Sequence, residues 1–333
     1  MTGSAVAEGT RSSVRKRGRA AGERRAAVSV VKRGLLIYNP IAGQRDRRKE
    51  MSSLIDRQRR RGLELVNAPT SGKGDATDIV RTFLKRGIDL VAVCGGDGTI
   101  SEVAAGLAGS TVPLGVLPAG TSNVLAIELG IPSTLAEAED LLLTGMPASY
   151  RLGQADGRPF LLWAGAGLDA RVMGNMNLAM KRVLGRAGIF FTAASQFLQY
   201  EFPNLEVEID GTAHEATFAV VCRARHYAGR WIIAPQARFG SDSLDVLLFN
   251  HRDRAKLFQL FVAMQQGKAA HLSDGLSKIV RGREVTIRSR ESYSVPIQLD
   301  GDCVMETPVI VRPSEETVQI LVPGPKSQAP SQD

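Results

Sequence analysis

The sequence has little of several features that would place it in a familiar class. Of its 333 residues, only three are cysteine and 5% are aromatic. The cysteines, Cys94, Cys222 and Cys303, lie far apart and outside any CxxC or Cys/His cluster, so they indicate neither a disulfide framework nor a zinc site. No apolar run approaches the ~20 residues of a membrane-spanning helix. No apolar segment follows the N-terminal arginines, so we expect no secretory signal and a cytoplasmic protein.

Positive charge is concentrated at the N-terminus. Residues 1–34 hold nine Lys and Arg residues against Glu8 and Glu23, a net charge of +7 out of +8 for the whole chain. The segment is also rich in Ala, Gly and Ser, so we expect residues 1–33 to form a disordered basic tail. Such a tail could stay solvated, contact anionic lipid headgroups at ~1 kcal/mol per basic residue, or contact nucleic acid. No nucleic-acid-binding module follows it, and nucleic acid is not an expected partner.

Residues 34–148 alternate between two kinds of pattern. Short apolar runs predict strands, and longer segments with apolar residues at helical spacing predict helices. The run DLVAVC is continuously apolar, which is typical of a strand buried on both faces of a parallel sheet. This alternation predicts an α/β domain with a doubly wound parallel sheet. The expected strands are 34–40, 63–67, 89–94 and 112–118. The expected helices are 46–61, one after the glycine-rich start of 70–87, 100–107, one within 119–132 that stops before Pro132, and 134–144.

The pattern changes after residue 148. Residues 151–172 resemble a hairpin of two strands, and most later runs are short and alternating, with one helix at 253–266. These runs, which end with TVQILVP, predict an antiparallel, β-sandwich-like domain over 149–323. Residues 324–333 are expected to be a loose tail. The segment 176–200 mixes Lys and Arg with Phe and Leu, so it either lies on a membrane surface or covers the second domain.

The stretch GGDGT at 95–99 is the clearest chemical signal. It matches neither the GxGxxG of dinucleotide-binding folds nor the GxxxxGK[ST] of P-loops. Glycines after a buried strand nevertheless let the backbone approach a ligand, and the following helix directs its N–H groups to the same place. Thr99 and Ser101 add hydroxyl groups. The arrangement favours an anion such as a phosphate.

Asp97 lies in the middle of this stretch. A carboxylate within an anion site needs a cationic partner, and Mg²⁺ carrying nucleotide phosphates would supply one. The alternative is that Asp97 is only a turn residue, for which aspartate is common. Both interpretations are compatible with the sequence.

Several motifs resemble the diacylglycerol kinase catalytic domain family, whose superfamily also includes sphingosine kinases, bacterial lipid kinases and NAD kinases. They occur in the family's order over roughly residues 34–323. The motifs are YNPIAG (38–43), TSGKGDA (70–76), GGDGT (95–99), LGVLPAGTSNVLAIELGIP (114–132), GAGLDARV (165–172), HYAGRWIIAPQARFGSDSLDVLLF (226–249) and IQLDGD (297–302).

The resemblance implies ATP and Mg²⁺ as cofactors and assigns roles to individual positions. Asp302 stands where the family has the glutamate of LDGE and would be the general base, with Asp300 as the second candidate. Asp97 would orient the Mg²⁺–phosphate array. The positions expected to contact ATP are Asn39, Gly43, Thr70, Gly95, Gly96, Asp97, Gly98, Thr99, Ile100, Ser101, Gly120, Thr121 and Asn123.

The chain departs from the family pattern at three places. Val124 follows Asn123, where the family has aspartate, and Ala228-Gly229-Arg230 replaces a glycine triplet. In bacterial relatives a DGxLDV stretch holds a structural Mg²⁺. Here it reads SDSLDV, which leaves Asp242 as the candidate ligand, one position out of register.

The resemblance implies a kinase that transfers the γ-phosphoryl group of ATP to a lipid hydroxyl, as in diacylglycerol or a sphingoid base. The expected partner is a lipid at the membrane surface, with peripheral contact at the inner face. An exposed sheet edge could support a homodimer. Two alternatives remain, namely a kinase of a soluble acceptor, as NAD kinases are, and a nucleotide-binding regulator without turnover.

Overall fold

The computed structural model describes residues 33–40, 46–174, 195–268 and 275–324. The tail predicted for 1–33 lies outside these ranges except for Arg33. Most of the segment 176–200 and the C-terminal tail also lie outside them. All of the described ranges belong to one compact unit.

A parallel sheet organises the N-terminal lobe, defined as the part that carries β1–β4 and α1–α5. Its strands lie in the order β2-β1-β3-β4, and all three strand pairs are parallel. Every residue of β3 is buried, as expected for a strand covered on both faces. The strands are β1 (Arg33–Tyr38), β2 (Glu64–Pro69), β3 (Leu90–Gly95) and β4 (Leu114–Pro118).

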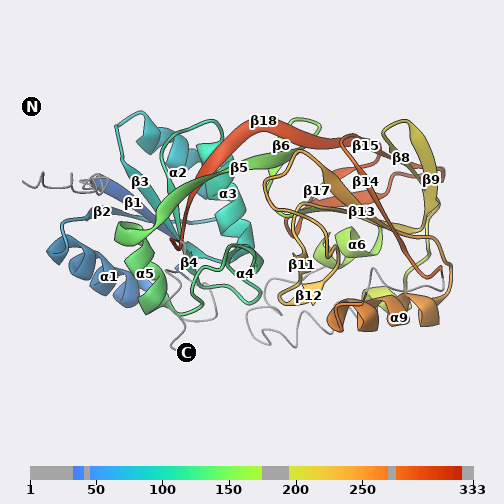
Figure 1. The fold of residues 1–333 in the computed structure, drawn as a ribbon, viewed down its shortest axis with the longest axis horizontal. Helices are drawn as coiled ribbons and strands as arrows, with labels where there is room; N and C mark the ends of the chain where they lie inside the picture. Colours follow the sequence, from blue (N-terminus) through green and yellow to red (C-terminus); the bar gives the residue numbers. More distant parts are fainter. Residues whose placement is uncertain (1–32, 41–45, 175–194, 269–274, 325–333) are drawn as a thin grey trace, which may run out of the picture. The chain divides into compact units, whose positions relative to one another are not determined.

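Helices cover this sheet on both sides, which confirms the doubly wound prediction (Figure 1). Helices α1 (Arg48–Arg60) and α5 (Leu135–Thr144) lie on one side, and α2 (Asp75–Leu84) and α3 (Asp97–Leu107) on the other. A fifth helix, α4 (Val124–Leu129), is short. Glycine permits the closest contacts: a Cβ on Gly106 of α3 would lie 2.8 Å from the Val80 Cβ of α2.

Two layers of antiparallel strands form the C-terminal lobe, which confirms the predicted sandwich. One sheet has the order β14-β13-β10-β7-β16-β17, and the other layer contains β18, β15, β8 and β9. Side chains alternate along β10: Ala219 and Val221 pack between the layers with Val207 and Ile287, whereas Val220 faces the opposite side. The strands are β7 (Trp163–Ala166), β8 (Leu205–Ile209), β9 (Thr212–Ala216), β10 (Phe218–Cys222), β13 (Leu244–Phe249), β14 (Lys278–Gly282), β15 (Val285–Ser289), β16 (Pro296–Leu299), β17 (Asp302–Glu306) and β18 (Val309–Val322).

The long strand β18 belongs to both lobes. Its start pairs with β15 and its end lies beside β4, where Ile320 is the parallel partner of Leu114. Along most of its length it also pairs with β5 (Met146–Ala155), which pairs in turn with β6 (Arg158–Phe160). The sequence pattern predicted only a short strand near TVQILVP in the second domain. The structure instead continues the first parallel sheet into the second lobe through one strand.

Two helices of the C-terminal lobe complete the fold. Residues 168–172, expected to extend a strand, begin helix α6 (Leu168–Gly174). Gly167, at φ +93°, ends β7 and turns the chain into this helix. Helix α9 (Arg254–Gln265) was predicted, and the Asp253 side chain caps it by accepting from the Ala255 N–H at 2.7 Å. A small hairpin of β11 (His226–Tyr227) and β12 (Trp231–Ile232) stands apart from both sheets.

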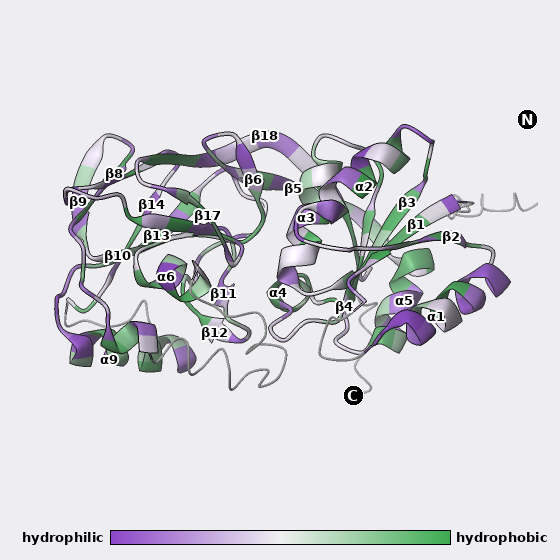
Figure 2. Ribbon diagram, turned by 180° about the vertical axis from the view of Figure 1, so that it is seen from behind, coloured by the Kyte–Doolittle hydropathy of each residue, from purple (hydrophilic) through white to green (hydrophobic). Residues whose placement is uncertain are grey.

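Figure 2 shows hydropathy along the ribbon: β1 and β3 at the centre of the parallel sheet are mostly hydrophobic, whereas α1 carries long hydrophilic stretches. Within the described ranges, no helix is long and apolar enough to cross a membrane.

The end of the shared strand that lies beside β4 should contribute strongly to stability. Ile320 is fully buried beside β4, whereas Ile310 on the same strand is 38% exposed. We expect Ile320→Ala to lower the free energy of unfolding by about 2–5 kcal/mol because it leaves a cavity. Ile310→Ala, the matched control, should change it by less than about 1 kcal/mol. Urea unfolding measures both, and equal effects would contradict the assignment.

Candidate functional site

The carboxyl ends of the four parallel strands bring most of the predicted nucleotide residues together. Asn39 follows β1 and Thr70 follows β2, and their backbone N–H groups donate to Cys94 O at 3.4 Å and Tyr38 O at 2.9 Å. The runs 95–101 and 120–123 follow β3 and β4. Ligands of open α/β sheets bind at this edge, where the strand order reverses. Gly43 lies outside the described residues.

Bare backbone lines the centre of this edge. Gly96 and Gly120 touch, because a Cβ on Gly120 would lie 2.5 Å from the Gly96 Cα. Gly98 differs, since a Cβ there would meet no protein atom within 4 Å. No side chain fits between Gly96 and Gly120, whereas Gly98 borders open space.

Asp97 is the first residue of α3, and its carboxylate connects two loops. Its Oδ1 accepts a hydrogen bond from the Leu125 N–H of α4 at 3.1 Å. Burial raises the pKa of Asp97 above its ordinary value, and the nearby Asp300 carboxylate adds to the rise. Asp97 thus fixes the start of α4 against the start of α3. Its action on Mg²⁺ stays a prediction.

Asn123 also has a partner within the loop. Its side-chain amide accepts from the Gly120 N–H at 2.8 Å and donates to the Gly120 carbonyl at 3.1 Å. Its φ of +47° lies in the left-handed region, which asparagine tolerates. The side chain therefore closes the loop 120–123, and the neighbouring Thr121 lies exposed on it.

The Asp300–Gly301 pair forms a two-residue turn between β16 and β17. Both residues have positive φ, +50° and +90°, which fits an Asp-Gly hairpin. The two residues thus form a tight polar turn. The turn directs the Asp300 side chain into the protein, whereas Asp302 follows at the start of β17.

Asp300 joins the two lobes. Its carboxylate accepts from the N–H groups of Leu161, Leu162 and Trp163 at 2.6, 2.7 and 3.1 Å. It also accepts from the Ser101 hydroxyl of α3. Burial raises its pKa, and these hydrogen bonds oppose the rise. Because four donors occupy both oxygens, Asp300 is poorly placed to accept a substrate proton.

Asp302 lies in a cavity of about 360 Å³ between α2, α3 and the β16–β17 hairpin. Its side chain is 39% exposed, and the Lys73 ammonium lies 3.0 Å from its Oδ1. The cavity is lined, among others, by Thr77, Arg81, Gly98, Ser101, Glu102, Arg158, Asp300 and Asp302. The start of the glycine-rich helix and an accessible carboxylate thus face the same space.

Sequence reasoning missed Glu102, although a signal was present. Gly98, Ser101, Glu102 and Ala105 follow the i, i+3, i+4, i+7 spacing of one helical face, and all four line the cavity. The Glu102 carboxylate accepts from the Gly74 and Ala76 N–H groups at 2.9 and 3.3 Å, so it caps α2. Burial raises its pKa. Lys73 lies within the TSGKGDA motif but was given no role, and Arg81 and Arg158 lie outside every motif.

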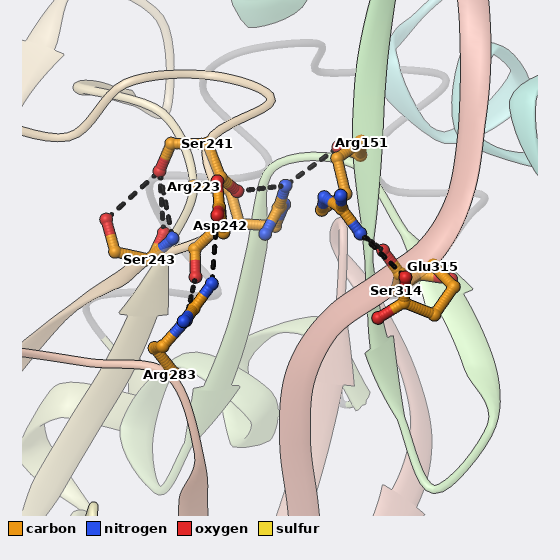
Figure 3. A network of polar contacts seen from close by, with 8 residues as sticks. All are labelled: Arg151, Arg223, Ser241, Asp242, Ser243, Arg283, Ser314 and Glu315. Atoms are coloured by element: carbon orange, nitrogen blue, oxygen red, sulfur yellow. Dashed lines mark hydrogen bonds and ion pairs between the residues drawn. The ribbon is translucent and has the colours of Figure 1, made fainter.

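The SDSLDV turn does not fit a structural metal (Figure 3). The Asp242 carboxylate pairs with Arg283 at 2.9 Å, and Arg283 also donates to the Asp242 carbonyl at 3.3 Å. Arg223, which is 1% exposed, donates to the carbonyls of Arg151 and Ser241 at 2.7 and 3.2 Å. The Asp245 carboxylate pairs with the guanidinium of Arg281 at 2.9 Å. Among the described residues, no group of three acidic, His or Cys side chains could hold a metal ion.

Arginines therefore occupy the oxygens that a cation would need at this turn. We expect removal of divalent cations with excess EDTA, in the absence of nucleotide, to leave the midpoint of thermal unfolding unchanged. A metal ion bound to the folded state would raise this midpoint, and its removal would lower it. The Asp242→Asn variant is the control. A midpoint that rises with Mg²⁺ in the wild type but not in this variant would contradict the interpretation.

Comparisons with known proteins agree with this architecture. A model described as the diacylglycerol kinase catalytic domain matches residues 33–155. One described as the YegS C-terminal NAD kinase beta sandwich-like domain matches residues 163–322. A crystal structure of a putative diacylglycerol kinase from Bacillus anthracis has a similar fold. Its TM-score is 0.70 at 23% identity, and the match covers 88% of this chain and 98% of that one.

Curated relatives match over similar lengths. The diacylglycerol kinase of Bacillus subtilis is 26% identical over 82% of this chain and 90% of its own. That of Mycobacterium tuberculosis is 28% identical over 86% and 94%. A probable YegS-like lipid kinase of Pseudomonas putida is 29% identical over 78% and 86%. Since the two domain models together span nearly all of both lobes, the chain belongs to the diacylglycerol kinase catalytic domain family and is an enzyme of this family of lipid kinases.

Proposed function

We propose that this kinase transfers the γ-phosphoryl group of ATP, supplied with Mg²⁺, to a hydroxyl of a lipid such as diacylglycerol or a sphingoid base. One observation carries the proposal. The accessible carboxylate of Asp302 faces the same cavity as Gly98 and Ser101, at the start of the glycine-rich helix. Phosphoryl transfer to an alcohol needs a phosphate cradle and a proton acceptor side by side.

The strand ends supply the cradle. The start of α3 presents backbone N–H groups, and Gly96, Gly98 and Gly120 keep side chains away from it. Mg²⁺ prefers one or two carboxylates together with phosphate oxygens and water. Asp97 directly precedes Gly98 in the sequence and is the carboxylate we assign to the ion. When bound with ATP, the ion would offset the charge of the phosphates.

Asp302 is the better placed of the two candidate bases. Four donors hold the Asp300 carboxylate inside the protein, whereas the Asp302 side chain is 39% exposed within the cavity. As the hydroxyl attacks the phosphorus, its proton would pass to the Asp302 carboxylate. Lys73 would keep this carboxylate oriented toward the cavity mouth.

The names of the relatives support a lipid acceptor, and we infer that the protein meets its substrate at a membrane surface. The description of the second domain model also mentions NAD kinase, so a soluble acceptor is the alternative. Val124 and Asp302 depart from the family pattern and suggested a regulator without turnover, but membership of an enzyme family does not support that alternative. The acceptor assay described below distinguishes these possibilities.

Gly98 offers a test of the nucleotide cradle. Gly98→Ala should raise the free energy of unfolding by about 0.5–1 kcal/mol, because alanine suits a helix and meets no protein atom there. The same methyl group should weaken ATP binding roughly tenfold to a hundredfold by crowding the phosphates. Calorimetric titration with ATP measures this.

Gly106→Ala is the control on the same helix. It should cost about 1–3 kcal/mol of stability through overpacking against Val80, with little effect on ATP affinity in the folded fraction. Unchanged ATP binding in Gly98→Ala would place the nucleotide elsewhere.

The transfer itself is tested with γ-labelled ATP, Mg²⁺ and a total lipid extract in mixed micelles, with parallel detergent-free reactions that contain NAD. We expect label in lipid. Asp302→Asn should lower the rate by about 10²–10⁴-fold because it removes the proton acceptor. Asp242→Asn makes the same chemical change outside the cavity and should remain active.

Label in NAD rather than lipid would favour the soluble acceptor. Bound ATP without any labelled product would contradict the proposed transfer. A fully active Asp302→Asn variant would exclude Asp302 as the base.

A further inference from the structure

A second group of polar side chains lies beneath the catalytic hairpin, inside the C-terminal lobe. Asp169 of α6 and Gln298 of β16 are 6% and 1% exposed. The Tyr227 hydroxyl of β11 donates to Asp169 Oδ1, and Gln298 Nε2 donates to Asp169 Oδ2 at 2.5 Å. The proposed transfer does not use these groups, and burying a carboxylate is costly unless it is hydrogen-bonded.

The chain of hydrogen bonds ends on the hairpin. Gln298 Oε1 accepts from the Gly301 N–H at 2.6 Å. A backbone N–H can only donate, so the amide oxygen of Gln298 must face Gly301 and its nitrogen must face Asp169. The orientation of every group from Tyr227 to Gly301 is therefore determined. Gly301 lies between the two carboxylate residues, Asp300 and Asp302.

The neighbouring strand makes room for these contacts. Gly165 of β7 pairs with Gln298, and a Cβ on Gly165 would lie 2.2 Å from Asp169 Oδ2 and 2.8 Å from Gln298 Nε2. Any other residue would separate Asp169 from Gln298. A second contact runs in parallel. The Tyr227 ring packs edge-on against the Trp163 ring with 5.2 Å between the ring centroids, and the backbone N–H of Trp163 donates to Asp300.

We propose that Tyr227, Asp169 and Gln298 are positioning residues that set the geometry of the Asp300–Asp302 hairpin and couple it to the β11–β12 hairpin. This inference rests on the proposed function in one respect, which is that Asp302 on this hairpin acts as the base. Asp300 and Gly301 have the positive φ values that an Asp-Gly turn favours, so contacts from outside are needed to set where the turn lies rather than to form it. The Gln298 contact on Gly301 holds the turn from below, and the Ser101 contact on Asp300 holds it from α3.

Exchanging the amide and the carboxylate tests the network. Gln298→Glu places two carboxylates against each other and should lower kcat by about 10²-fold through misplacement of Asp302, with KM for ATP nearly unchanged. Asp169→Asn alone should have a smaller effect, because its amide can still accept from Gln298. The double variant Asp169→Asn/Gln298→Glu restores donor opposite acceptor along the chain and should recover most of the lost kcat.

Two further variants complete the set. Gln259→Glu makes the same change on the exposed side of α9 and should behave as the wild type. Tyr227→Phe keeps the ring packing, removes one donor, and should lower kcat by roughly tenfold. A wild-type kcat in Gln298→Glu and Tyr227→Phe, or a double variant as slow as Gln298→Glu, would overturn the proposal while leaving the proposed function intact.

A readout without turnover separates the two proposals. Hydrogen–deuterium exchange at the Gly301 amide should be slow in the wild type, fast in Gln298→Glu and slow again in the double variant. If the wild type transfers no phosphoryl group, the proposed function fails, yet this exchange pattern still tests the network. Equal exchange in all variants would overturn it.

Discussion

The Asp300 carboxylate is the interaction on which the arrangement of the site depends. It is buried, and both of its oxygens are occupied by three backbone N–H groups of the C-terminal lobe and the Ser101 hydroxyl of the N-terminal lobe. A buried charge of this kind is tolerated only when it is hydrogen-bonded on all sides. The position of α3 relative to the β16–β17 hairpin, and hence the cavity between them, follows from this requirement.

The sheet shared through β18 supports the same arrangement over a longer distance. Because one strand pairs with β15 at its start and lies beside β4 at its end, the two lobes have a continuous backbone connection. A cavity between two independent lobes would open and close with their motion. Here the cradle at the strand ends and the carboxylate at Asp302 belong to parts that the sheet and the Asp300 contacts hold together.

Charge is distributed differently in the cavity beside Asp302 and at the SDSLDV turn. The cavity is lined by both acidic and basic residues, and Lys73 pairs with Asp302 at its edge, which suits an anionic substrate accompanied by a cation. At the turn, Arg283 and Arg223 meet the carboxylate and carbonyl oxygens directly. An arginine carries a permanent charge and several donors, so it can replace a bound cation without depending on metal supply. Where the sequence departs from DGxLDV, arginine side chains therefore take the place that a metal ion would have.

Local rules accounted for much of the fold. The alternation of strands and helices and the helix near residues 253–266 depend on neighbours in sequence, and the structure agrees with both. The prediction of an anion site at GGDGT likewise rests on neighbouring residues. The error at residues 168–172 arose because Gly167 redirects the chain by a conformation that apolar patterning does not reveal. The hairpin at Asp300–Gly301 was also readable, since Asp-Gly strongly favours such a turn.

The sequence alone thus determined the class of fold, the order of its elements, the family and the strand ends where a nucleotide would lie, because periodicity, turn residues and motif order are local. Only the tertiary structure decided that Asp300 points inward and Asp302 outward, that Glu102 caps α2, and that Asp169 reaches Gly301 through Gln298. Those contacts join residues as much as 199 positions apart, as for Ser101 and Asp300. No pattern along the chain encodes which distant donors will surround a carboxylate, since the packing of both lobes sets that geometry.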